Sequence, residues 1–171
     1  MNTRLLKSIR LLLLDVDGVL TDGRVHYSDN GEELKAFSTQ DGLGIRLLQK
    51  YGIQVGLVSG RVSGAVRRRA SELGIDLIYE GVRDKAALLE DIRGRTGITA
   101  PETAFVGDDL VDLPVMNRIG AAIAVANAVE DVKSAAAATT RSSGGRGAVR
   151  EVAEAILKAQ NRWEEVLREF Q

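Results

Sequence analysis

The feature that most constrains the fold is a set of short, continuous apolar runs, each followed by polar residues or glycine. The five runs cover residues 9–18, 53–60, 75–81, 103–109 and 121–128. Each has the length of a strand, and none alternates cleanly between apolar and polar residues, as expected of strands buried on both faces. Helix-like segments lie between the runs, and this alternation predicts an α/β fold with a doubly wound parallel sheet.

The segments between the runs carry helix start and stop signals. Ser63 and Asp84 are suited to N-capping, and Gly52 and Gly74 are suited to ending a helix. We expect helices over residues 41–52, 63–74, 83–97, 130–139 and 147–170, and a short helix or turn over residues 111–120. The last of these is long and amphipathic, with a break near Asn161.

One segment, residues 23–41, interrupts the alternation of strands and helices directly after the first predicted strand. It reads as a β-hairpin with the turn "SDNGE" between "RVHY" and "ELKAFS", where a plain βαβ unit would have a helix. The only Ser/Gly-rich loop, residues 139–151, is too short to separate domains. The sequence therefore predicts a single domain over residues 1–171.

Composition limits the possible partners and metals. The net charge of −1 gives no basic field that would attract nucleic acid, so we expect none as a partner. The chain has no cysteine and only His26 as a histidine, so any metal is held by oxygen ligands, which favours Mg²⁺, Mn²⁺ or Ca²⁺. The N-terminal apolar run is short and leads into acids, unlike a signal peptide. No apolar stretch approaches a membrane span, so we expect a cytoplasmic protein without membrane contact.

Polar residues follow the predicted strands at the points where they end. They are Asp15, Asp17, Ser59, Lys85, Asp108, Asp109 and Asp112. Ligands of open parallel sheets bind beyond the carboxyl ends of the strands, where these residues are expected to meet. Crowded carboxylates need a cation, while a hydroxyl and an ammonium can hold an anionic oxygen. This set of groups favours phosphoryl transfer.

The sequence "DVDGV", followed by "VSG", a lysine and "GDDLVD", resembles the four motifs of the haloacid dehalogenase superfamily of phosphotransferases. The resemblance implies that Asp15 is the nucleophile and Asp17 the general acid and base. It also implies that Asp15, the backbone carbonyl of Asp17 and Asp108 hold Mg²⁺. Ser59 and Lys85 would hold the transferring phosphoryl group, and Asp109 and Asp112 would complete the acidic loop, with Asp112 steadying Lys85.

Four further segments narrow the resemblance to the 3-deoxy-D-manno-octulosonate 8-phosphate (KDO 8-phosphate) phosphatase family. They are "NGEELKAFSTQDGLGIR" (30–46), "SGR" (59–61), "GDDLVDLPVM" (107–116) and "GGRGAVREV" (144–152). This family acts in lipopolysaccharide inner-core biosynthesis and has no cap domain. Its members are homotetramers whose hairpins pair around a central axis, so the resemblance implies that the hairpin serves oligomerisation.

By the same resemblance, a phosphorylated sugar acid would contact the "STQDG" segment (38–42), several arginines and two of the motif residues. Arginine suits both the carboxylate and the phosphate of such a substrate. The implied contacts are Asp17, Ser38, Thr39, Gln40, Asp41, Gly42, Arg46, Arg61, Arg69, Lys85 and Arg146.

Two other functions remain as alternatives. Related capless phosphatases act on nine-carbon sugar acids such as KDN 9-phosphate and tend to have Glu after the glycine of the second motif, whereas this chain has Arg61. Signalling receiver domains also combine acids, a hydroxyl and a lysine. Their acids all precede the lysine in sequence, whereas Asp108 and Asp109 follow Lys85 here.

Overall fold

The leucine run of the first motif forms the fully buried strand β1 (Leu11–Leu14) near the centre of a parallel six-stranded sheet. In this computed structural model, which describes residues 3–171, the strand order is β5-β4-β1-β6-β7-β8. The other strands are β4 (Gln54–Val58), β5 (Leu77–Tyr79), β6 (Thr103–Gly107), β7 (Ala121–Ala124) and β8 (Ala138–Thr139). β1 pairs in parallel with both β4 and β6, so the predicted doubly wound α/β fold is confirmed.

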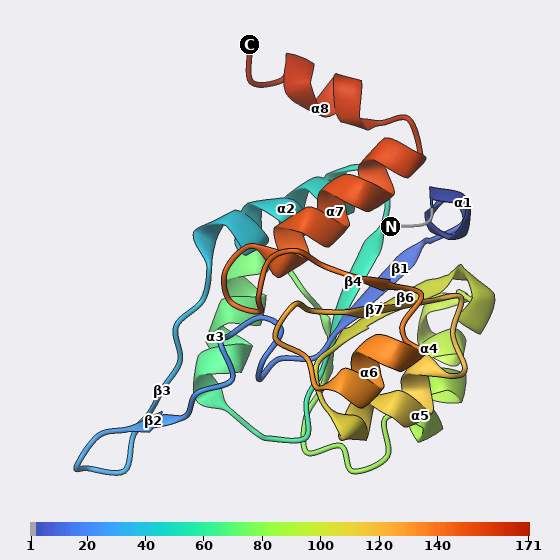
Figure 1. Cartoon of the computed structure of the whole chain (residues 1–171). Helices are drawn as coiled ribbons and strands as arrows, with labels where there is room; N and C mark the ends of the chain where they lie inside the picture. The colour runs from blue at the N-terminus through green and yellow to red at the C-terminus, as the bar shows by residue number, and fades with distance from the viewer. Residues whose placement is uncertain (1–2) are drawn as a thin grey trace.

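Helices cover both faces of the sheet (Figure 1). One face carries α2 (Thr39–Lys50), α3 (Gly64–Leu73) and α7 (Ala148–Ala159). The other carries α4 (Leu89–Thr96), α5 (Leu113–Met116) and α6 (Glu130–Ala135). The remaining helical segments are α1 (Thr3–Leu6), α8 (Trp163–Arg168), η1 (Ala86–Leu88), η2 (Ala100–Glu102) and η3 (Leu110–Asp112).

One helix prediction needs correction at its end. The segment predicted as one helix over 130–139 splits, because α6 ends at Ala135 and β8 then pairs with β7. An alanine-rich run carries no local signal that separates a helix end from a two-residue strand. The predicted break near Asn161 is confirmed, since this residue has a φ of 58° and separates α7 from α8.

The predicted hairpin is also confirmed, with β2 (His26–Tyr27) antiparallel to β3 (Glu33–Leu34). It projects away from the sheet at the lower left of Figure 1. Between β1 and β4 the chain forms this hairpin and α2, with no separate cap domain. No helix within residues 3–171 is long and apolar enough to cross a membrane.

Candidate active site

The two motif-one acids stand where β1 leaves the core. Asp15 is almost completely buried, and its backbone N–H donates to the carbonyl of Val106 on β6, so the sheet fixes its position. The chain then turns at Gly18, whose φ of 104° favours glycine. A Cβ at this position would overlap the carboxylate of Asp108, so the absence of a side chain lets the first and fourth motifs meet.

Lys85 is the centre of a buried ion-pair network at this edge. Its ammonium contacts Asp15 and lies 2.6 Å from the Oδ1 atom of Asp112. Burial by itself would lower the pKa of Lys85, but the two facing carboxylates raise it above its usual value, so the lysine stays charged. Asp112 is fully buried, and its other oxygen accepts the backbone N–H groups of Asp108 (2.9 Å) and Asp109 (3.3 Å). Both oxygens of Asp112 are therefore engaged in organising the loop.

Three acids converge closely enough to hold a metal ion. One carboxylate oxygen from each of Asp15, Asp108 and Asp112 lies within 4.8 Å of the others. Burial, with repulsion from Asp112, raises the pKa of Asp15 to about 7 against the opposing effect of Lys85. Burial, together with repulsion from neighbouring acids, raises the pKa of Asp108 to about 7 as well.

This donor set fits a hard divalent cation. The pKa values of Asp15 and Asp108 are raised mainly because burial disfavours their ionised forms, and nearby acids add to this effect. An oxygen-preferring cation would stabilise the ionised forms. Both oxygens of Asp112 are engaged, one by Lys85 and the other by the loop amides, whereas Lys85 contacts Asp15 through its Oδ1 atom. Asp15 and Asp108 are therefore the carboxylates better placed to bind a metal. The predicted third ligand, the backbone carbonyl of Asp17, stays a prediction.

Ser59 and Arg61 reach the same edge from the end of β4. Ser59 is buried, its N–H donates to the Tyr79 carbonyl, and its Oγ accepts the N–H of Arg61 at 3.1 Å. The Arg61 side chain extends toward the hairpin, where its Nε lies 4.0 Å from the Oδ2 atom of Asp17. The structure therefore brings Arg61 beside the second acid of the first motif.

The predicted substrate-binding segment, residues 38–42, opens helix α2. Ser38 caps the helix, and Thr39 and Gln40 are exposed. Asp41 instead is buried and accepts the N–H groups of Gly147 (3.3 Å) and Arg150 (2.8 Å) at the start of α7. Its carboxylate therefore caps a helix that starts more than a hundred residues later.

The predicted arginines other than Arg61 have different surroundings. Arg69 donates to the Ser38 carbonyl and lies where a Cβ on Gly42 would stand, so this glycine makes room for it. Arg46 lies seven residues after the start of α2 at Thr39, which is about 10 Å along the helix axis. Its side chain donates to the backbone carbonyl of Glu72 at 2.7 Å. The structure does not bring Arg46 to the acid cluster.

The glycine-rich segment before α7 lies against the first motif of the same chain. A Cβ on Gly144 would overlap the carbonyl of Gly18, and Asn127 bridges the two by donating to that carbonyl and accepting the Gly144 N–H. Arg146 follows on the surface and lines a shallow hollow of about 310 Å³ together with Gln40. Sequence reasoning gave Arg146 as a substrate contact, but it missed the close approach of the Gly144 backbone to the Gly18 carbonyl.

Sequence reasoning also missed two charged residues of the hairpin, Glu33 and Lys35. The side chain of Lys35 is fully buried and contacts Asp17, and its Nζ lies 2.8 Å from the Oε1 atom of Glu33. Burial opposes charge on Lys35, but its two carboxylate partners raise its pKa above the usual value. The signal was present in "EELK", where alternation puts Glu33 and Lys35 on one face of a strand.

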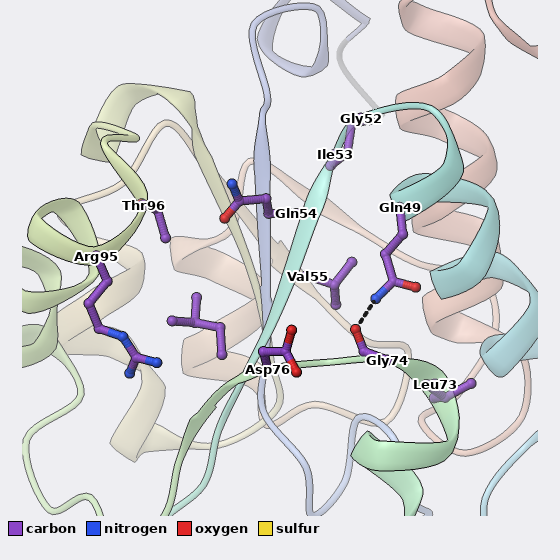
Figure 2. A pocket seen from close by; sticks show the side chains of 11 residues that line it. Gln49, Gly52, Ile53, Gln54, Val55, Leu73, Gly74, Asp76, Arg95 and Thr96 are labelled. Atoms are coloured by element: carbon purple, nitrogen blue, oxygen red, sulfur yellow. Dashed lines mark hydrogen bonds between the residues drawn. The ribbon is translucent and has the colours of Figure 1, made fainter.

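A larger hollow lies at the opposite end of the strands from the acid cluster (Figure 2). Its volume is about 560 Å³, and its lining includes Gln54, Asp76, Arg95 and Thr96. These residues stand near the amino ends of β4 and β5, so none of the acid cluster lines the cavity. The convergent charges, rather than the size of the hollow, therefore identify the candidate active site.

Comparison with known proteins identifies the family to which the chain is similar. Residues 75–152 match the haloacid dehalogenase-like hydrolase family. A 3-deoxy-D-manno-octulosonate 8-phosphate phosphatase of Haemophilus influenzae is 45% identical over 92% of this chain and 87% of its own length.

Solved structures extend the comparison to three dimensions. The phosphatase of the same name from Moraxella catarrhalis, in complex with magnesium, phosphate and KDO, is 43% identical and superposes with a TM-score of 0.96 over 99% of this chain and 97% of its own. The Yersinia pestis phosphatase is 42% identical with a TM-score of 0.93, covering 95% of this chain and 88% of its own.

Proposed function

Because this chain belongs to the haloacid dehalogenase-like hydrolases and, among them, to the KDO 8-phosphate phosphatases, we propose that it hydrolyses KDO 8-phosphate to KDO and inorganic phosphate with Mg²⁺ as cofactor. The observation that carries the proposal is the likeness, along nearly the whole chain, to a structure that holds magnesium, phosphate and KDO. The acid cluster at the sheet edge supplies matching chemistry.

Asp15 and Asp17 divide the reaction into two steps. In the first, a carboxylate oxygen of Asp15 forms a bond to phosphorus while the bond to the sugar oxygen breaks, and Asp17 protonates that oxygen. In the second, Asp17 takes a proton from water as the water attacks the aspartyl-phosphate, which releases phosphate and restores Asp15. Each proton is received or given by the side chain of Asp17.

Ser59 and Lys85 hold the phosphoryl group during both steps. Ser59 offers a hydroxyl donor from the end of β4, and Lys85 offers a positive charge fixed by Asp15 and Asp112. Asp15 and Asp108 would hold Mg²⁺, with the Asp17 carbonyl as a third ligand. When bound, this ion neutralises negative charge on the phosphoryl group and on the two acids.

Recognition of the sugar acid involves the positive and polar groups around this edge. Arg61 has the strongest support, because it already lies beside Asp17. Arg69 of α3, which donates to the Ser38 carbonyl, and the exposed residues Thr39 and Gln40 of α2 are further candidates, as is Arg146 for the substrate carboxylate. Asp41 and Gly42 contribute by holding α7 and Arg69 in place.

A substrate panel tests the proposal against its closest rival. KDO 8-phosphate should be hydrolysed with a much higher kcat/KM than KDN 9-phosphate or a sialic acid 9-phosphate, and EDTA should abolish the activity. A clear preference for a nine-carbon acid would overturn the choice of substrate while leaving the phosphatase chemistry intact.

The proposal includes an assembly and a cellular role. We infer a cytoplasmic homotetramer that acts in lipopolysaccharide inner-core biosynthesis, with hairpins paired between subunits. The exposed apolar side chains of Val25, Tyr27 and Leu34 on this hairpin support a buried contact of that kind. A solution mass equal to one chain would contradict the tetramer.

A further inference from the structure

The hairpin places a buried lysine beside the second acid of the first motif. The Lys35 side chain has no exposed area, and its ammonium contacts Asp17 and Glu33, with Nζ 2.8 Å from the Glu33 Oε1 atom. A lysine ammonium is kept out of water only where partners compensate its charge, and here both partners are carboxylates. Lys35 therefore holds the carboxylates of Asp17 and Glu33 close together.

The strand geometry of the hairpin explains how Lys35 reaches this position. Tyr27 pairs with Glu33 across the two strands, so their side chains share a face, and Lys35 continues that face two residues later. The same face meets Arg61, which donates to the Tyr27 hydroxyl at 2.9 Å and lies 3.5 Å from Glu33. Leu34 points the other way and is exposed.

The contact with Lys35 gives the two oxygens of the Asp17 carboxylate different surroundings. Lys35 holds Oδ1, whereas Oδ2 has Arg61 4.0 Å away, beyond hydrogen-bond distance. Without the ammonium, Asp17 and Glu33 would face each other as like charges, and Asp17 would turn away. Proton transfer to a leaving oxygen requires a donor within hydrogen-bond reach, so a rotation of this carboxylate would directly affect that step.

We propose that Lys35 is a positioning residue that fixes the Asp17 carboxylate for proton transfer to the leaving group, with Glu33 holding the lysine in place. The inference rests on the proposed function in assigning the acid role to Asp17. It adds a second task for the hairpin, because the segment that projects from the sheet also sets the orientation of a reacting side chain.

The dependence on the leaving group separates this role from a general structural one. A sugar alkoxide needs a proton as it leaves, whereas p-nitrophenolate leaves readily without one. The ratio kcat/KM reports on the steps through the first phosphoryl transfer, so a defect in protonation lowers it for the alkyl ester and spares it for the aryl ester. A distorted fold would lower both values alike.

The experiment compares Lys35→Met with the wild type on KDO 8-phosphate and p-nitrophenyl phosphate. The variant should lose about 100-fold in kcat/KM on the sugar ester and less than about fivefold on the aryl ester. Lys35→Arg, which keeps the charge, should recover most of the loss. Ser28→Ala is the matched control, because it removes the hydrogen bond that the Glu32 N–H donates to the Ser28 hydroxyl in the hairpin turn and touches neither Asp17 nor Arg61. It should change kcat/KM for neither substrate by more than about threefold.

Glu33→Gln provides a second test if Lys35→Met does not fold. It should show the same bias against the sugar ester, with a loss of about tenfold. Equal losses on the two esters, or no loss on either, would overturn the inference. If the wild type does not cleave KDO 8-phosphate, the proposed substrate fails, and a simple primary alkyl phosphate compared with the aryl ester still tests Lys35.

Discussion

The two acids of the first motif are held in the same way by two very different parts of the molecule. Each pairs with a buried lysine that is shared with a second carboxylate. The core flank consists of Asp15, Lys85 and Asp112. The hairpin flank consists of Asp17, Lys35 and Glu33.

The flanks differ in the structure that supports them. The residues of the core flank follow the carboxyl end of β1 and lie in the segments after β5 and β6. Their three side chains are almost fully buried. The hairpin flank depends on a ladder of two residue pairs that projects from the sheet. A two-stranded hairpin is marginal without further packing, so Asp15, the proposed nucleophile, has a rigid support, and Asp17, the proposed acid and base, has a more adjustable one.

The strongest test of the core flank is Asp15→Asn. Loss of the proposed nucleophile should lower kcat by about 10⁴-fold or more, while the fold remains, because the amide keeps the size of the carboxyl group. Steady-state kinetics and circular dichroism check the two parts of this expectation. Substantial remaining turnover would refute the nucleophile assignment.

The two lysines allow a direct comparison of stability. Lys85→Met should lower the free energy of unfolding by about 3–5 kcal/mol, because it leaves Asp15 and Asp112 uncompensated in the core. Lys35→Met should cost about 1 kcal/mol, since the partners Asp17 and Glu33 are partly exposed and can turn to water. Urea titrations of both variants measure the difference, and equal losses would remove the proposed distinction between the flanks.

The close contact behind the first motif gives a test that involves no charge. Gly144→Ala should destabilise the protein by about 1–3 kcal/mol, because the new methyl group would overlap the Gly18 carbonyl. Gly94→Ala is the matched control, since a Cβ at that position meets no neighbouring atom. Thermal unfolding of the two variants should differ clearly, and a Gly144→Ala protein as stable as the control would contradict the packing described.

The buried acids Asp15 and Asp108 should also make stability depend on pH and metal. Because Asp15 and Asp108 have pKa values of about 7 in the folded chain, against 3.8 ordinarily, the metal-free protein should lose stability as pH rises from about 4 through about 7. A divalent cation binds the ionised forms, so the increase in Tm caused by Mg²⁺ should be larger at pH 8 than at pH 5.5. Equal increases at the two pH values would contradict this coupling.

Much of the core flank could be predicted from sequence, because its residues follow apolar runs. A continuous buried strand shows where it ends, and parallel strands bring those ends together, so Asp15, Lys85 and Asp112 could be assigned to the same place at the carboxyl ends of the strands. The hairpin flank gave a weaker signal. Lys35 and Glu33 lie in a stretch that resembles an exposed strand, and their partner Asp17 stands 18 residues before Lys35.

Other missed features also depend on contacts between distant segments. Asp41 was assigned to the substrate from its motif, but its carboxylate caps α7 through the backbone of Gly147 and Arg150. The need for glycine at position 144 arises from the approach of another loop rather than from a local turn. Sequence patterns report local conformation and burial well, and they do not specify which distant backbone atom a side chain will meet.

The order of strands in the sheet has a consequence for handling the protein. The fully buried strands β1 and β6 lie inside the sheet, and its edges are formed by β5 and β8, which have three and two residues. Open, flat edges template the pairing of one chain with another, and very short edge strands limit that pairing. The four-leucine strand, which as an isolated segment would be prone to aggregate, is therefore shielded on both sides once the sheet has formed.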